Sequence, residues 1–465
     1  MSDSRLSGDL NRGRLLIRLV SFGIPLVLGM FFHSLFNLVD LIIVGKLGTY
    51  ALAAVNTATL INFVPMLIST GVNNASIAVI SRNFGMRSYG RANANTLQSF
   101  LLLVMLAVVL GVPSYYYADQ LNRLVGSEGA ALPAANDYLE IMSLGLFTMF
   151  ALMQVTAVLR AGGNARMPMI LMIGANALNV FLTIDMVHGL LGFPKWGVAG
   201  AAWSTVIARG IFALFGLYLI TRPAAPVRLI LRKIKLRPRM IWNLTRIGIP
   251  SSLQFVVRVV AYGAILRLVT EFGSGQSMHA ALAVGFRLDM LATFTGAGWG
   301  AASAAMVGQA LGGGFKQRAQ RTGWAAAILD GLMMAGIGIL FYRYASELMI
   351  LFGDNPATNP DFQETHDLGV EYLQIAVYGY AFAGIGITLA QSLNGAGSTK
   401  MPLLLDTVGF LGIQIPLAAY IALNHVEHDF DRSTLWWSLV ATTAVVAALY
   451  AVVWNYGHWK HKKIR

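Results

Sequence analysis

The sequence predicts an all-α integral membrane protein with twelve transmembrane helices in two pseudo-symmetric six-helix lobes. Of its 465 residues, 56% are hydrophobic and only 12% are charged, which is too few charges to coat a soluble protein of this length. Apolar stretches recur along the whole chain, and motifs from its first half return in the same order in its second half. The composition indicates a membrane protein, and the repeat indicates two related halves.

Each predicted helix is an apolar segment long enough to cross a bilayer, which takes about 20 residues. Twelve segments qualify: 16–43, 51–80, 95–118, 136–159, 167–191, 196–220, 241–271, 277–310, 321–345, 369–395, 401–424 and 433–457. The polar, basic segment 1–14 lacks the apolar core and cleavage site of a signal peptide. We therefore expect the first helix to remain in the mature protein.

Three pairs of motifs relate the two halves. "SFGIPLVLG" at 21 returns as "RIGIPSSLQ" at 246, "AVISRNFGMRSYGRA" at 78 as "AMVGQALGGGFKQRA" at 305, and "LRAGGNARMP" at 159 as "LNGAGSTKMP" at 393. The offsets of 225, 227 and 234 residues drift slowly, as small loop insertions would cause. We predict an N-lobe at 1–221, a basic linker at 222–240 and a C-lobe at 241–465. Two similar lobes that rock about a central site are typical of secondary transporters.

The net charge of +13 comes from basic loops on one predicted side of the membrane. On this side lie three basic segments: the first residues of the chain, the segment 222–239 and the tail "KHKKIR". The loops on the other side are richer in acids. Such a distribution follows the positive-inside rule and predicts a multi-pass cytoplasmic (inner) membrane protein with both termini and the linker in the cytoplasm. It argues against a nucleic-acid partner, and a lipid or phosphate site in 222–239 is the minor alternative.

Enzyme motifs are absent from the sequence. The chain has no cysteine, so thiol catalysis and thiolate metal sites are excluded. No Walker A loop, GxSxG elbow or histidine pair at metal-ligand spacing occurs. We expect no enzyme activity and no cofactor other than a coupling ion.

Asp40 stands alone in the apolar run "LVLGMFFHSLFNLVDLIIVG". An acid in a membrane helix is costly and marks a functional site by default. His33, Asn37, Asp40 and Val44 follow spacings of four, three and four, so they share one helix face. The carboxyl group can carry a proton, because burial favours its neutral form, or it can bind sodium with nearby oxygen atoms. The alternative is a structural acid that only joins helices.

The chain resembles the multidrug and toxic compound extrusion (MATE) family over nearly its full length. The resemblance rests on "FNLVDLIIVGKLGTYALAAVN", "LRAGGNARMP" and "GVAGAAWSTVIAR", together with their counterparts in the second half. It implies antiport of organic cations or other amphiphiles against protons or sodium by alternating access. The wider superfamily contains lipid-linked saccharide flippases, which are the alternative function.

Within the family, the chain looks like the DinF-like branch. The position eight residues after Pro250 holds Arg258 where the NorM-like pattern has a glutamate, and the stretch "LQIAVYGYAFAGIGITLAQSLNG" of the tenth helix has no acid. We therefore expect ion coupling in the N-lobe. The resemblance implies an ion-coupling network that comprises Asp40, Asn37, Tyr138, Asn179, Thr183, Asp185 and Thr205.

One position departs from the DinF-like pattern. Thr183 stands where the branch carries an aspartate, and Asp185 follows two residues later. Two residues turn a helix by about 200°, which points Asp185 away from Asn179. A sodium ion, if it is the coupling ion, is expected at Asp40, Asn179 and Thr183.

The predicted substrate cavity uses residues of both lobes. His33 and Arg258 are related by the offset of 225, as are Asn37 and Tyr262, and Met153 adds an adaptable apolar surface. We expect small amphiphilic substrates, membrane lipid as the surroundings, and a monomer.

Overall fold

The computed structural model describes residues 8–45, 47–189, 194–230, 234–271, 275–352, 359, 362–424 and 431–462. Within these ranges the chain is helical and has no β-strand. The predicted all-α class is confirmed.

The first half of the chain contains eight helices within the described ranges. They are α2 (Leu15–Gly45), α3 (Thr49–Gly85), α4 (Tyr89–Tyr116), α5 (Ala118–Leu124), α6 (Ala131–Leu144), α7 (Leu146–Ala161), α8 (Arg166–His188) and α9 (Gly197–Thr221).

The second half repeats this order with more irregular helices. Its α-helices are α10 (Pro238–Leu268), α11 (Gly275–Gly312), α12 (Lys316–Arg343), α13 (Ala345–Phe352), α14 (Gln363–Ala376), α15 (Tyr380–Gly395), α16 (Lys400–Asp406), α17 (Ile415–Leu423) and α18 (Arg432–Tyr456). The 3₁₀ turn η4 (Val377–Gly379) joins α14 to α15, and the π-helical segment η5 (Thr407–Gln414) joins α16 to α17. Short 3₁₀ turns follow α10 at η2 (Val269–Glu271) and α18 at η6 (His458–His461).

The prediction of twelve membrane spans is confirmed for the described residues. Eleven helices or helix pairs are long and apolar enough to cross a membrane, and α6 with α7 makes a twelfth span that bends by 48° at Gly145. A Cβ atom at Gly145 would lie 2.2 Å from Cγ2 of Val206 on α9. Glycine at the bend therefore lets α9 approach closely. The sequence did not predict this break.

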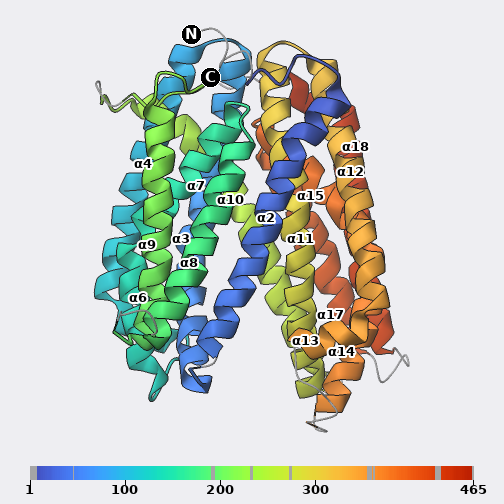
Figure 1. Ribbon diagram of the computed structural model, residues 1–465. Helices are drawn as coiled ribbons and strands as arrows, with labels where there is room; N and C mark the ends of the chain where they lie inside the picture. The colour runs from blue at the N-terminus through green and yellow to red at the C-terminus, as the bar shows by residue number, and fades with distance from the viewer. Residues whose placement is uncertain are drawn as a thin grey trace.

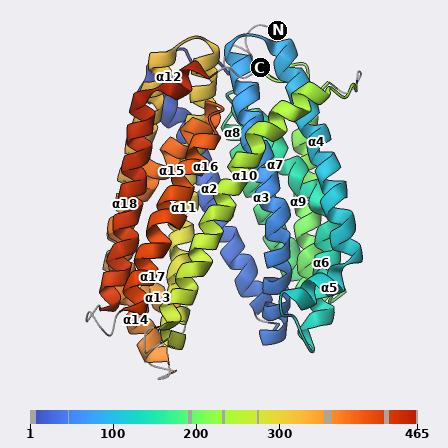
Figure 2. The ribbon, with the colours of Figure 1, turned by 180° about the vertical axis from the view of Figure 1, so that it is seen from behind.

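The two halves of the chain meet at one end of the molecule and diverge toward the other (Figures 1 and 2). Both termini lie at the end where the halves meet. The first long helix of each half, α2 and α10, crosses between the halves: α2 packs on α11 as well as α8, and α10 packs on α3.

We call the end that holds the termini the sealed end, because contacts between the halves gather there. A Cβ atom at Gly85 on α3 would lie 2.1 Å from the carbonyl oxygen of Gln309 on α11, and one at Gly312 would lie 2.1 Å from that of Arg82. Asn74 Nδ2 donates a hydrogen bond of 2.8 Å to Ser251 Oγ on α10. Two backbones this close leave no room for solvent between α3 and α11 at this level.

The N-terminal segment before α2 also ties the halves together. The backbone N–H of Leu10 donates to Oε1 of Gln309 at 3.0 Å, and Gln309 Nε2 donates to the carbonyl oxygen of Ala161 at 3.0 Å. Arg318 on α12 donates to the carbonyl oxygens of Leu10 and Gly13. The buried Gln309 of the second half thus hydrogen-bonds to the N-terminal segment and to the first half.

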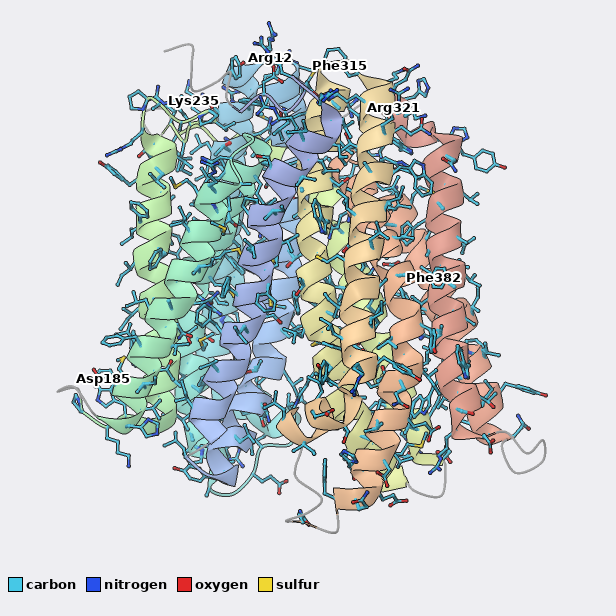
Figure 3. The ribbon with its side chains drawn as sticks, turned by 45° about the vertical axis from the view of Figure 1, so that its right-hand side comes forward. Arg12, Asp185, Lys235, Phe315, Arg321 and Phe382 are labelled. Carbon is cyan, nitrogen blue, oxygen red and sulfur yellow. The ribbon has the colours of Figure 1, made fainter. Side chains whose placement is uncertain are left out.

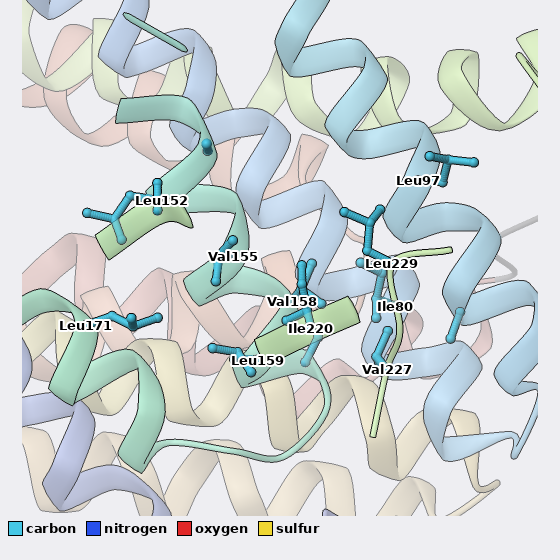
Figure 4. Close-up of a cluster of buried hydrophobic side chains, with 14 of the residues drawn as sticks. Ile80, Leu97, Leu152, Val155, Val158, Leu159, Leu171, Ile220, Val227 and Leu229 are labelled. Carbon is cyan, nitrogen blue, oxygen red and sulfur yellow. The ribbon is translucent and has the colours of Figure 1, made fainter. Parts of the chain in front are cut away.

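The apolar core of the first half surrounds α7 (Figure 4). Ile220 at the end of α9 packs there with Val227 and Leu229 from the segment that follows. The backbone N–H of Leu229 donates to the carbonyl oxygen of Ile220 at 2.9 Å. The described part of the predicted linker is therefore folded against the first half.

Candidate functional site

A buried polar network joins α8 to α9. Asn179 Nδ2 donates to Oγ1 of Thr205 at 3.0 Å, to Oγ of Ser204 at 3.3 Å and to Oγ1 of Thr183 at 3.4 Å. The hydroxyls of Thr183 and Ser204 lie 2.7 Å apart, and both residues are fully buried. Asn179 and Thr183 are four residues apart, so one face of α8 presents both to α9. The structure brings together three predicted residues and adds Ser204.

The polar stripe of α2 lies along this network. His33 Nδ1 is 3.1 Å from Nδ2 of Asn176, one turn before Asn179 on α8. Val44 packs in an apolar cluster with Val187, Val198 and Ala201 of α8 and α9. Ala201 also supplies the carbonyl oxygen that accepts hydrogen bonds from Ser204 and Thr205.

Asn37 and Asp40 occupy backbone positions of α2 between His33 and Val44. Their side chains lie outside the described part of the structure. The described members of the stripe, one on each side of these two positions, both contact α8 or α9.

Tyr138 and Asp185 are both buried, Tyr138 in an apolar cluster and Asp185 near the end of α8. Tyr138 on α6 is buried in the cluster that contains Val44. Asp185 is also buried, close to the end of α8, where the backbone N–H of Gly189 donates to its carbonyl oxygen. Figure 3 places Asp185 at the far end of the molecule from Arg12 and Arg321.

The other predicted cavity residues are distributed over three helices and do not form one cluster. Met153 on α7 is partly buried, and its Sδ accepts a hydrogen bond from Ser69 Oγ on α3 at 3.7 Å. Tyr262 on α10 stacks edge-on against Phe286, with ring centroids 4.0 Å apart. His33 contacts α8, as described above.

Arg258 forms a buried ion pair within the second half. Its Nε donates to Oδ2 of Asp406 at 3.1 Å, and Tyr450 Oη on α18 donates to Oδ1 of the same carboxylate at 2.7 Å. The guanidinium also lies over the ring of Phe410, at 5.8 Å from its centroid. The side chain of Arg258 is 33% exposed and that of Asp406 is 0% exposed.

A small pocket opens beside Arg258, between α10 and α15. Its lining comprises Gln254, Phe255, Arg258, Ile387, Ala390 and Gln391. Gln254 is held by Asn394 and by the carbonyl oxygen of Thr399. The pocket therefore combines one cation and two amides with apolar side chains.

Two further acids with hydrogen-bond partners lie inside the second half, and the sequence did not single them out as candidates. Asp289 on α11 accepts hydrogen bonds from the hydroxyls of Tyr372 at 2.5 Å and Tyr380 at 2.6 Å. Asp330 on α12 is fully buried and accepts from Thr388 Oγ1 at 2.7 Å. A single acid in an apolar run, the signal that identified Asp40, is also present at Asp330 in "AAAILDGLMMAG".

The network on α8 and α9 can bind a hard cation or relay a proton. Hydroxyl and amide oxygens are ligands that alkali and alkaline-earth cations accept. Among the described residues, no group of three or more histidines, cysteines or acids is arranged to hold a metal ion. The contacts of the network that the structure describes offer a cation the neutral oxygens of Thr183, Ser204 and Thr205.

A family model matches this chain over most of its length. The family model MatE matches residues 25–184 and 250–420, well over half of the sequence and parts of both halves. The chain belongs to the MatE family. The resemblance found in the sequence is thereby confirmed at the level of the family.

Similar proteins match this chain over most of their own length. The probable multidrug resistance protein YpnP of Bacillus subtilis is 26% identical over 470 residues, which cover 98% of each chain. The probable multidrug resistance protein NorM of Thermotoga maritima is 22% identical over 456 residues, with 96% of this chain and 93% of that protein covered.

Solved structures show that the chain has the MATE fold. An outward-facing multidrug resistance MATE family transporter superposes with a TM-score of 0.88 at 22% identity, over 98% of both chains. A MOP superfamily transporter from Pyrococcus furiosus superposes with a TM-score of 0.90 at 22% identity, over 98% of this chain and 99% of that one. The MatE chain is therefore a multi-pass membrane protein.

Proposed function

We propose that this MatE protein is a secondary antiporter that exports amphiphilic, cationic compounds in exchange for protons or sodium by alternating access. The observation that carries the proposal is the buried network of Asn179, Thr183, Ser204 and Thr205 beside the polar stripe of α2. Buried polar groups in membrane helices face protein or a water-filled path, and they mark ion routes. The relatives named as multidrug resistance proteins support the substrate class.

Asp40 is the proposed coupling group. His33 and Val44, on the same predicted helix face, contact α8 and the cluster beside Ala201 respectively. The positions of Asn37 and Asp40 lie between them in the sequence, and we infer from these two neighbours that the shared face of α2 is the one turned toward α8 and α9. A carboxyl group there adds the negative charge that the network of neutral oxygens lacks.

The arrangement of charges supports an orientation with both termini in the cytoplasm. The basic residues Arg12, Lys235 and Arg321 lie at the sealed end (Figure 3). Under the positive-inside rule this end faces the cytoplasm, and the proposed cytoplasmic (inner) membrane location follows. The conformation described is then closed to the cytoplasm, and export requires the contacts of the sealed end to break and reform in each cycle.

The charge of the pocket favours an antiporter over a lipid-linked saccharide flippase. A flippase must hold a pyrophosphate, which calls for several unpaired cations. The cation that lines the described pocket, Arg258, is paired with Asp406. A neutralised cation repels cationic compounds less and offers little to a diphosphate.

Transport in proteoliposomes separates these two functions. The purified protein is reconstituted, a pH gradient or a sodium gradient is imposed, and uptake of ethidium and of a fluorescent lipid-linked sugar is followed. We expect ethidium transport that depends on one of the two gradients. Movement of the sugar lipid alone, without ethidium transport under either gradient, would establish the flippase function instead.

A further inference from the structure

We propose that residues 8–13, the segment before α2, form a strap that holds the sealed end closed. The strap contacts both halves of the chain, so it must come loose from one of them before the halves can separate at this end. This role is independent of the compound and of the ion that the protein transports, and it therefore goes beyond the proposed antiport.

Glycines of the repeated motif "LRAGGNARMP" contact the strap from the first half. A Cβ atom at Gly8 would lie 2.4 Å from the carbonyl oxygen of Gly162, and one at Gly163 would lie 2.0 Å from the carbonyl oxygen of Gly8. Gly163 also has a φ of +80°, which favours glycine. Gly397, its counterpart under the offset of 234 residues, has a φ of +77°. Both halves thus contain the same turn, and in the first half its glycines let the strap lie directly against it.

Arg318 on α12 and Gln309 on α11 hold the strap from the second half. Arg318 Nη1 donates to the carbonyl oxygen of Gly13 at 3.1 Å, and its Nη2 donates to that of Leu10 at 3.2 Å. Gln309 Oε1 accepts from the backbone N–H of Leu10 at 3.0 Å, and Gln309 Nε2 donates to the carbonyl oxygen of Gly8 at 3.3 Å. The strap lies outside any helix, so its backbone groups need partners from elsewhere. Side chains of the second half supply them.

Leu10 anchors the strap in an apolar cluster between the halves. Its side chain is buried, and the cluster includes Ala157 of α7 together with Trp299 and Ala302 of α11. When the strap lifts, this side chain becomes exposed to water. Lifting therefore costs apolar burial as well as hydrogen bonds.

Gln309 connects the strap to both halves at once. Its Nε2 also donates to the carbonyl oxygen of Ala161 at the end of α7, at 3.0 Å. These contacts require the halves to lie together at the sealed end, so they stabilise the conformation described and not one in which this end is open. Weakening them shifts the population toward the open conformation.

The rate at which a maleimide labels one introduced cysteine tests this role. The chain has no cysteine, and Ser251→Cys places one at a buried contact with Asn74 that involves no strap residue. Adding Arg318→Met keeps a long side chain and removes both donors to the strap. We expect labelling to become about tenfold faster, the size expected when two hydrogen bonds are lost. Arg321→Met is the matched control, because it removes an exposed cation from the same helix at the same end (Figure 3).

A second variant loosens the strap from the other half. Gly8→Ala adds the Cβ atom that would lie 2.4 Å from the carbonyl oxygen of Gly162, and we expect it to speed labelling of the cysteine at position 251 as well. Hydrogen exchange of residues 8–13, measured by mass spectrometry on the same variants, reports whether the strap itself has loosened. We expect faster exchange in Arg318→Met and Gly8→Ala and wild-type exchange in Arg321→Met.

Three results would overturn the proposal. Faster exchange of residues 8–13 with an unchanged labelling rate would show that the strap covers the sealed end without holding it closed. Wild-type exchange in both Arg318→Met and Gly8→Ala would show that the described contacts do not hold the strap. Equal labelling of Arg318→Met and Arg321→Met would assign the effect to the lost charge. Neither measurement uses a substrate or a gradient, so the outcome is separate from that of the ethidium assay.

Discussion

Thr183 occupies the position at which the resemblance to the DinF-like branch leads us to expect an aspartate, and its hydroxyl is fully buried against that of Ser204. A hydroxyl in this place can donate to or accept from Ser204, and it also lies within reach of Asn179. This position carries a neutral oxygen in place of the expected carboxylate, and the face of α8 remains polar. Asp40 on α2 is the proposed source of negative charge for the network.

The first prediction concerns this hydroxyl. Thr183→Val keeps the shape of the side chain and removes the oxygen, so Ser204 loses one partner and Asn179 another. We expect a loss of about 1–3 kcal/mol in the free energy of unfolding, together with reduced gradient-driven uptake of ethidium. Thermal denaturation of the purified protein and the proteoliposome assay measure the two effects.

Thr183→Ser is the matched control, because it keeps the hydroxyl and loses only a methyl group. Uptake near the wild-type rate is expected from this variant. Equal damage from Thr183→Ser and Thr183→Val would mean that packing at this position matters and the network does not.

At the scale of elements, Gly145 permits the break between α6 and α7. An added Cβ atom would meet Val206 on α9 at 2.2 Å, and valine cannot rotate away easily because its side chain is branched at Cβ. The bend of 48° lets α6 and α7 both pack against α9. It also places Tyr138 of α6 in the cluster next to the network.

The second prediction tests this contact. Gly145→Ala should lower the free energy of unfolding by about 1–3 kcal/mol through overpacking, seen as a lower melting temperature. Val206→Ala in the same chain removes the obstructing methyl groups and should recover most of the loss. A double variant no more stable than Gly145→Ala would show that the contact with Val206 is not the cause.

The sequence predicted the helical spans well, because apolar length is a strong local signal. It did not predict the break at Gly145, since a glycine in a helix carries little information without the neighbour that packs on it. The same holds for the π-helical segment Thr407–Gln414. Asn179 and Thr183 were predicted through the resemblance to the MATE family. The ion pair of Asp406 with Arg258 was not predicted, because the two residues lie 148 positions apart in the sequence.

At the scale of the whole molecule, glycines let α3 and α11 touch at the sealed end. The carbonyl oxygen of Gln309 lies 2.1 Å from where a Cβ atom at Gly85 would be. Backbone cannot move aside as a flexible side chain can. Substitution at Gly85 should therefore push the halves apart at this end and favour the opposite conformation of the transport cycle.

The third prediction follows from this packing. The chain has no cysteine of its own, so Ser251→Cys, at a buried contact between the halves, provides a single reporter. Adding Gly85→Ala should raise the rate at which a maleimide labels it. Gly336→Ala is the matched control, because nothing lies within 4 Å of a Cβ atom there. Equal labelling in both variants would contradict the role of the glycine contact.

The fourth prediction concerns the orientation of the molecule. Tags at both termini should be protected from an external protease in intact cells, whereas a cysteine introduced at Asn359 should react with an impermeant reagent. Asn359 precedes α14, whose end of the molecule lies opposite the termini (Figure 1). Cleavage of the terminal tags from outside would reverse the proposed orientation.

Gradient-driven uptake by Asp40→Asn tests most directly whether Asp40 is the coupling group. The amide is nearly isosteric and neutral, so we expect normal expression and an unchanged melting temperature, yet no ethidium uptake under a pH or sodium gradient. Asp185→Asn, reconstituted in the same way, is the control and should retain more uptake than Asp40→Asn. An Asp40→Asn protein that takes up ethidium at the wild-type rate would contradict the account.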